Sequence, residues 1–157
     1  MRPPENNDRQ VAELYREAIL AHAVHPQGHN RSLNVTHRAT RNNPLCGDHI
    51  EVYLQLEDDL VVEIGFTGEA CAICLASASL LCGHIPGMPA AVLSEALTGF
   101  SQGLDEAGLP VDAGHPCPEY LAPMLGVRAF PARIACATLP WETAIAALEH
   151  PVLQDAS

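Results

Sequence analysis

The chain has 157 residues, about the size of one compact domain, and 48% of them are apolar. We therefore expect a single globular domain over residues 1–157, with flexible tails at 1–8 and 151–157. The 8 basic and 19 acidic residues give a net charge of -11, which disfavours binding to nucleic acid or anionic lipid. All the basic residues are arginine, which excludes a Schiff-base lysine and the lysine of a P-loop.

The chain shows no sign of a membrane segment or a secretory signal. Its first eight residues are polar, and no apolar run approaches the ~20 residues that span a bilayer. We therefore expect a cytoplasmic protein without a membrane partner. In that compartment the six cysteines should be mostly reduced, so each one is a candidate ligand, nucleophile or core residue.

The first half of the chain predicts one helix and an antiparallel sheet. The helix covers 9–23 and follows Asp8, a good N-cap, because apolar residues recur there every three or four positions. Further on, apolar and polar residues alternate on both sides of an acidic turn at Glu57–Asp59. In the second run, one face holds Leu60, Val62, Ile64 and Phe66. We predict three strands, at 33–40, 50–56 and 60–66.

The second half is rich in Ala and Leu and predicts helices. Gly83 is expected to end the first of them, Pro89 to open the second, and Gly108 and Pro110 to close it. The expected helices cover 71–81, 89 to about 107, 118–125 and 140–149. The sequence thus predicts an α+β fold, in which helices pack on one side of a small three-stranded antiparallel sheet.

Three cysteines lie at the ends of predicted elements. Cys46 is in a turn-rich loop two residues before Asp48, Cys71 starts a helix, and Cys136 directly precedes the last helical segment. At a helix start, unpaired N–H groups and the macrodipole favour a thiolate. If these ends meet at one edge of the domain, the three thiolates and the Asp48 carboxylate form a four-coordinate site for Zn²⁺ or iron.

The mixed set of donors has chemical consequences. A structural zinc site usually has four Cys, or three Cys and one His, so a carboxylate among thiolates indicates a site that opens. The ligands carry a charge of about -4 against the +2 of the ion, and Arg133, three residues before Cys136, is the expected compensating cation. His49, next to Asp48, is a candidate for a supporting contact from outside the ligand set.

A simpler interpretation is open for each cysteine, because a free Cys taken alone is more often a small core residue than a ligand. We expect a core position for Cys82 and Cys117. Cys74 forms a Cys-x-x-Cys pair with Cys71, typical of a redox dithiol or half a zinc knuckle, but the second pair that a zinc ribbon needs is absent from the sequence. Cys74 is therefore expected to pack beneath the site or to act as an auxiliary thiol.

Three ordered motifs carry a resemblance to a known family; they are Asn43 to Asp48, Gly68 to Ser79, and Arg133 to Trp141. With them, the chain from about Leu14 to about Leu148 resembles the U-type iron–sulfur cluster assembly proteins, the family of SufU, IscU and the NifU N-terminal domain. It looks most like the SufU branch. Ala135 stands where the IscU branch has His, and a chain without lysine cannot contain that branch's Leu-Pro-Pro-Val-Lys segment.

The resemblance implies a SufU/IscU-like fold and the metal ligands Cys46, Asp48, Cys71 and Cys136, with Cys46 as the sulfur acceptor. It also implies a function: the protein receives persulfide sulfur from a SufS-type cysteine desulfurase, while bound Zn²⁺ holds the thiolates, and passes the sulfur to downstream assembly components. Thiol exchange by a released thiolate fits this chemistry.

Two other functions fit the same residues. The same ligands suit a scaffold on which a [2Fe–2S] or [4Fe–4S] cluster is assembled and transferred. A structural zinc domain without sulfur chemistry is the third possibility. The residues alone therefore leave open whether the protein is a sulfurtransferase-like acceptor or a non-enzymatic scaffold.

Overall fold

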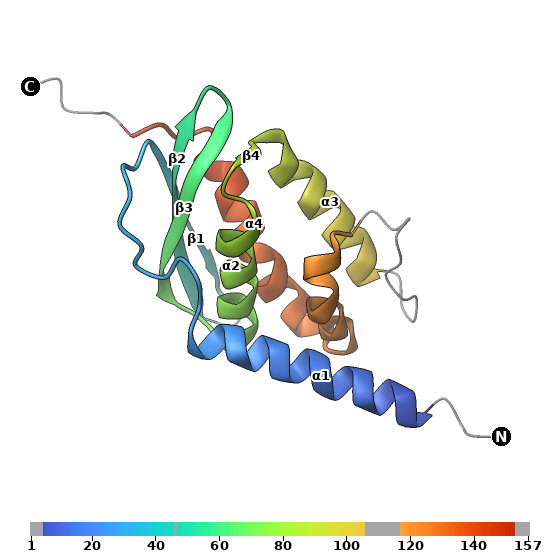
Figure 1. The fold of residues 1–157 in the computed structure, drawn as a ribbon. Coiled ribbons are helices and arrows are strands. Elements are labelled where there is room, and N and C mark those ends of the chain that lie inside the picture. Colours follow the sequence, from blue (N-terminus) through green and yellow to red (C-terminus); the bar gives the residue numbers. More distant parts are fainter. Residues whose placement is uncertain (1–4, 46, 106–116, 153–157) are drawn as a thin grey trace, which may run out of the picture.

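The computed structural model describes residues 5–45, 47–105 and 117–152. Figure 1 shows an antiparallel sheet with the helices on one of its sides and α1 lying across one end. This arrangement confirms the predicted α+β class. In chain order the elements are α1 (Glu5–Val24), β1 (His37–Asn43), β2 (Asp48–Glu57), β3 (Leu60–Glu69), α2 (Ala72–His84), β4 (Met88–Pro89), α3 (Ala91–Asp105), the 3₁₀ helices η1 (Glu119–Ala129) and η2 (Pro131–Arg133), and α4 (Ile134–Ala147).

The sheet has four strands in the order β1-β2-β3-β4, so the predicted count of three was wrong. The additional strand, β4, has two residues, and Met88 and Pro89 pair with Val61 and Leu60. Pro89 was expected to open a helix. Such a short edge strand has no alternation for a sequence pattern to detect, and α3 begins only at Ala91.

The hairpin of β2 and β3 turns at Asp58 and Asp59, which both have positive φ, as in the tight turns that favour Asp. The acidic turn was therefore predicted correctly. The strand after it was predicted only in part, because the register shifts between Gln55 and Leu56. Val61 is consequently buried, whereas Val62, expected on the buried face, is 37% exposed.

The segment between α1 and β1 crosses the outer face of the sheet. It pairs with the edge of β3, where Phe66 N–H donates to the Gly28 carbonyl (2.9 Å) and Asn30 N–H donates to the Phe66 carbonyl (2.8 Å). The Tyr53 hydroxyl, on that outer face, donates to the Arg31 carbonyl at 2.8 Å. The chain is still crossing at the residues predicted to start a strand, so β1 begins at His37 and not at Leu33.

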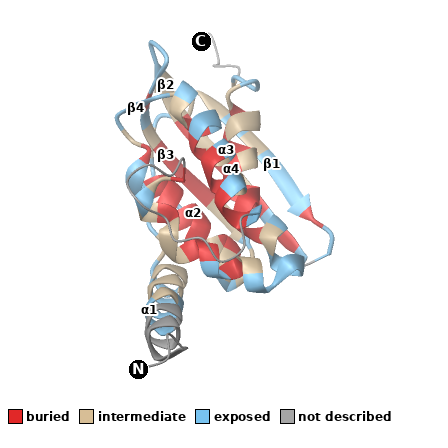
Figure 2. Ribbon diagram, turned by 90° about the vertical axis from the view of Figure 1, so that its right-hand side faces the viewer, coloured by how far each residue is buried: buried red, intermediate tan, exposed pale blue. Residues whose placement is uncertain are grey.

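Helix α2 is the centre of the core, between the sheet, α1 and α4 (Figure 2), and all residues from Ala76 to Cys82 are buried. Its small residues let α4 approach closely, and Trp141 Nε1 donates to the Ser77 hydroxyl at 3.1 Å. Gly83 lies inside α2 and not after it, and the Gln27 side chain occupies the space that a Cβ at position 83 would need.

The last helix begins six residues earlier than predicted, at Ile134, with Pro140 in its interior. A proline cannot donate to the carbonyl four residues before it, here that of Cys136, and this loss is outweighed by the burial of the helix, in which Trp141 is fully buried. Cys136 therefore lies in the first turn of α4 and not before the helix.

The remaining predictions concern the ends of the chain and the loop after α3. Helix α1 begins at Glu5, four residues before the expected start. At the other end, Pro151 bridges to His37, and Val152 N–H donates to the Thr36 carbonyl at 2.7 Å. Gly108 and Pro110 lie outside the described residues. In the described part of the chain, no helix is both long and apolar enough to cross a membrane.

Candidate metal centre

Three of the predicted ligands come together where strands and helices end at one edge of the sheet. Asp48 is the first residue of β2, Cys71 is the N-cap of α2, and Cys136 lies in the first turn of α4. Their ligand atoms all lie within 4.8 Å of one another. Cys46, the fourth predicted ligand, lies outside the described residues.

The Asp48 carboxylate connects β2 to the start of α2. Its Oδ1 accepts the Cys71 backbone N–H at 2.8 Å, and its Oδ2 lies 3.6 Å from Cys71 Sγ, which donates to it. Among the described residues, the Cys71 side chain makes no capping hydrogen bond of its own. Asp48 therefore caps α2 from a neighbouring strand, which gives its buried charge a partner at the positive end of a helix dipole.

Asn43 organises the connection between β1 and β2. Its carbonyl accepts Gly47 N–H at 2.8 Å, and its side-chain Oδ1 accepts Leu45 N–H at 3.2 Å. Its amide Nδ2 donates to Cys136 Sγ at 3.6 Å. Gly47 has φ of +73°, a conformation that favours glycine. Asn43 thus links the connection between the strands to a thiol that lies 93 residues further along the chain.

Sequence reasoning assigned no role to Asn43. The signal that could have found it is Asn followed by Pro, because an Asn side chain often accepts the N–H two residues on and shapes a turn. Its contact with Cys136 joins β1 to α4, and no spacing within one motif indicates such a contact.

The donor set fits zinc or iron. Two thiols and one carboxylate offer the sulfur and oxygen ligands that these ions accept, whereas Mg²⁺ and Ca²⁺ prefer oxygen alone. Zn–S and Zn–O bonds are about 2.3 Å and 2.0–2.2 Å long. Ligand atoms that lie within 4.8 Å of one another therefore need only small side-chain adjustments to contact one ion.

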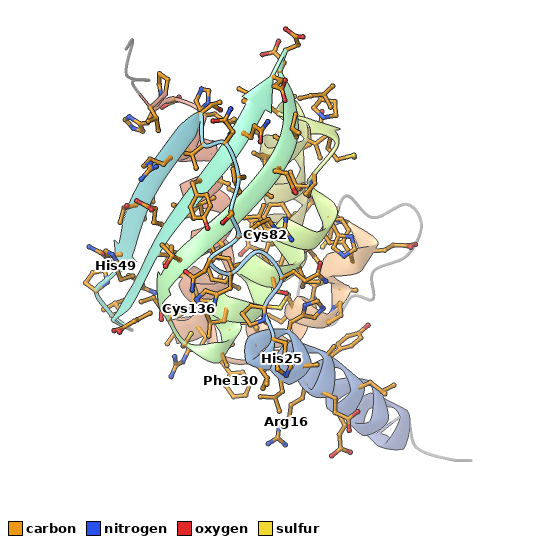
Figure 3. All side chains as sticks on the ribbon, turned by 60° about the vertical axis from the view of Figure 1, so that its left-hand side comes forward. Arg16, His25, His49, Cys82, Phe130 and Cys136 are labelled. Atoms are coloured by element: carbon orange, nitrogen blue, oxygen red, sulfur yellow. The ribbon has the colours of Figure 1, made fainter. Side chains whose placement is uncertain are left out.

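Three further residues were predicted to support the site from outside the ligand set. Among the described residues, the cluster of ligand atoms contains neither His49 nor Cys74. His49, next to Asp48, points to the opposite face of β2, is exposed, and places Nδ1 2.5 Å from Asn42 Oδ1 (Figure 3). Arg133 ends η2, just before α4, and its side chain is exposed. Cys74 is fully buried in the hydrophobic core, on α2 beyond Cys71.

The two cysteines expected in the core are there. Cys82 and Cys117 are 1% and 2% exposed. Burial raises the pKa of the Cys82 thiol to about 12 and that of the Cys117 thiol to about 11. Both are therefore protonated at neutral pH and poor metal ligands.

Comparisons with known proteins find relatives of this chain. Residues 14–99, more than half of the chain, match the family described as the NifU-like N terminal domain. The zinc-dependent sulfurtransferase SufU of Bacillus subtilis is 36% identical over 132 residues, which are 82% of this chain and 85% of that protein. The iron–sulfur cluster assembly scaffold protein IscU of Streptococcus pyogenes is 31% identical over 131 residues, 82% and 78% of the two chains.

The fold has a close counterpart among solved structures. The crystal structure of a nitrogen-fixing NifU-like protein (N-terminal) from Brucella abortus superposes with a TM-score of 0.75 at 25% sequence identity, over 88% of this chain and 94% of that one. The helices and sheet that hold Asp48, Cys71 and Cys136 thus occur in an arrangement already seen in that protein. The chain belongs to the family of the NifU-like N-terminal domain.

Proposed function

We propose that this protein is a zinc-dependent sulfur acceptor, which takes persulfide sulfur from a SufS-type cysteine desulfurase and passes it to iron–sulfur cluster assembly in the cytoplasm. The observation that carries the proposal is the meeting of Asp48, Cys71 and Cys136 beside the connection that contains Cys46. The similarity to a protein named zinc-dependent sulfurtransferase supports it.

In this proposal Cys46 is the residue that reacts. Its thiolate attacks the outer sulfur of the persulfide on the desulfurase, and a bond forms between Cys46 Sγ and that sulfur. The bond between the outer sulfur and the desulfurase cysteine breaks, and this cysteine leaves as a thiolate. The product is a persulfide on Cys46. One sulfur atom moves and no external oxidant or reductant is consumed.

The other residues keep the thiolates ready for this reaction. Cys46, Asp48, Cys71 and Cys136 would hold the zinc, which when bound keeps thiols deprotonated at neutral pH. Asp48 is held by the Cys71 N–H, so one of its oxygens already has a partner when the other binds metal. A carboxylate binds zinc less strongly than a thiolate does, which favours ligand exchange. Arg133 offsets part of the negative charge.

The test combines metal analysis with sulfur transfer. Freshly purified protein should contain about one zinc per chain, should stimulate a SufS-type desulfurase supplied with cysteine, and should gain one sulfur atom on the Cys46 peptide by mass spectrometry. Cys46→Ala should remain folded and lose both stimulation and sulfur uptake. Cys82→Ala, a matched change at a core thiol, should keep both. A folded Cys46→Ala protein that stimulates fully would overturn the proposal.

The same measurements separate the other two functions. A scaffold, as the name of the Streptococcus pyogenes relative says of that protein, would carry a transferable iron–sulfur cluster in place of zinc after anaerobic purification. A purely structural zinc domain would unfold in Cys46→Ala, because its zinc would be needed for folding.

A further inference from the structure

Asn43 is the last residue of β1, and three of its polar atoms face the candidate metal centre or the connection leading to it. The residue is 6% exposed and pairs with Asp48 in the register of β1 and β2. Its carbonyl and Oδ1 accept the N–H groups of Gly47 and Leu45, the two neighbours of Cys46 in the sequence. The same side chain therefore contacts both the connection and the Cys136 sulfur.

The orientation of the Asn43 amide follows from its partners. A backbone N–H can only donate, so the atom that faces Leu45 N–H must be the oxygen. The nitrogen then faces Cys136 Sγ, at 3.6 Å. A donor aimed at sulfur stabilises a thiolate more than a thiol, because a hydrogen bond to an ionised acceptor is stronger.

We infer that Asn43 is a positioning residue of the metal centre: its amide N–H orients the Cys136 thiolate toward the metal, and its two acceptor oxygens hold the connection that contains Cys46. The inference deepens the proposed function, since it rests on the same zinc site. Groups that hydrogen-bond to metal ligands from outside the ligand set commonly change metal affinity by about 10- to 100-fold when they are replaced.

The decisive variant is Asn43→Asp. It has nearly the same shape and keeps the oxygen that accepts Leu45 N–H, but it replaces the donor to Cys136 with a carboxylate oxygen. The matched control is Asn42→Asp, the same change one residue earlier on the exposed face, where it keeps the oxygen that pairs with His49. Both variants add one negative charge to the same strand, but only Asn43→Asp removes the donor to Cys136 Sγ.

Zinc affinity, measured by competition with a chelator, should fall about 10- to 100-fold in Asn43→Asp. It should stay within about twofold of the unmodified protein in Asn42→Asp. The thiolate-to-metal absorption band of the cobalt-substituted protein should also shift in Asn43→Asp alone. Thermal unfolding of the metal-free proteins shows whether both variants fold. A folded Asn43→Asp protein with unchanged zinc affinity and an unchanged cobalt spectrum would overturn the inference.

A second measurement needs no substitution and decides the matter if Asn43→Asp does not fold. In the unmodified protein loaded with an NMR-active cadmium isotope, the Asn43 side-chain amide proton should show scalar coupling to the metal through Cys136 Sγ. No coupling at this proton would overturn the inference. Neither measurement involves a desulfurase, so a protein that binds metal as expected but accepts no sulfur would refute the proposed function and leave the role of Asn43 intact.

Discussion

Cys136 and Cys82 are both almost completely buried, at 0% and 1% exposure, yet their surroundings are opposite in kind. Cys136 lies at the end of the sheet, with the Asn43 amide and the other cluster residues around its sulfur. Cys82 lies farther along α2 (Figure 3), in the apolar core, and its side chain packs directly against the backbone of Gly28. Burial alone therefore does not separate a candidate ligand from a core thiol.

The polar neighbours of each sulfur make the difference. Loss of hydration raises the pKa of Cys82 to about 12, although the Arg31 guanidinium nearby acts in the opposite direction. At the sheet edge, the Asn43 amide donates to Cys136 Sγ and the Cys71 N–H at the start of α2 donates to Asp48. Such donors stabilise the negative charge that a metal site with thiolate and carboxylate ligands must hold. We therefore expect two groups of thiols that differ in reactivity and in zinc binding. They are the edge pair, Cys71 and Cys136, and the core pair, Cys82 and Cys117.

The largest expected difference is in chemical reactivity. At pH 8, a thiol of pKa about 12 has on the order of 1000-fold less thiolate than a free cysteine of pKa about 8.5. In folded, zinc-free protein, Cys82 should react with iodoacetamide at least about 1000-fold more slowly than in urea-unfolded protein. Cys71, partly exposed at the start of α2, should react faster than Cys82. Peptide mapping by mass spectrometry measures both rates. Equal rates at Cys71 and Cys82 would contradict the comparison.

Zinc affinity should separate the two groups next. Cys136→Ser removes a ligand, which should weaken zinc binding by more than the roughly 100-fold that loss of a supporting contact can cost. Cys117→Ser, the same change in the core, should leave the zinc affinity within about twofold, because its sulfur is not in the cluster. Competition with a chelator measures both. Weak zinc binding in a folded Cys117→Ser protein would show that the core pair also supports the metal.

A smaller effect is expected from the two functions of Asp48. In zinc-free protein, Asp48→Asn keeps an oxygen for the Cys71 N–H, whereas Asp48→Ala leaves that N–H without its acceptor. Asp48→Ala should therefore be less stable than Asp48→Asn by about 0.5–2 kcal/mol, the usual contribution of a capping side chain. Urea unfolding of the two zinc-free variants measures it. Equal stability would show that the carboxylate matters to the edge cluster only as a ligand.

Much of the fold could be predicted because the relevant signals are local. Alternation located the β2–β3 hairpin, and apolar periodicity located the helices. The errors arise where distant segments decide the outcome. Gly83 lies inside α2 with the Gln27 side chain packed on it, and Pro140 is accepted inside α4 because the helix is buried. The two-residue strand β4 exists only through its pairing with β3.

The candidate site divides in the same way. Asp48, Cys71 and Cys136 could be predicted to converge, because each lies at the end of an element and the motifs around them resemble a family. Their hydrogen bonds could not be predicted. Asp48 caps a helix that begins 24 residues later, and Asn43 reaches a sulfur on the last helix. Such contacts depend on how strands and helices pack, which no spacing within a motif records.

The smallest expected effect tests whether the C-terminal end of α2, beside the core thiol Cys82, has a pH dependence independent of the metal. His84, at the end of α2, stacks on Tyr120, with ring centroids 4.0 Å apart. Partial burial, with a smaller contribution from the charge of His22, lowers the pKa of His84 below its usual value of about 6.5. The folded protein therefore favours the neutral ring, and stability should be full above about pH 6.5 and decrease as the pH falls below it.

This decrease should persist in zinc-free protein, because His84 is not part of the cluster of Asp48, Cys71 and Cys136. His84→Gln removes the titrating group, so the drop in Tm between pH 7.5 and pH 5.5 should be smaller in the variant than in the unmodified protein. Scanning calorimetry of both zinc-free proteins measures the drop. If the two drops are equal, the acid sensitivity originates elsewhere. If zinc abolishes the drop in Tm of the unmodified protein, the acid sensitivity originates at the metal centre. The two regions would then not differ in their pH dependence.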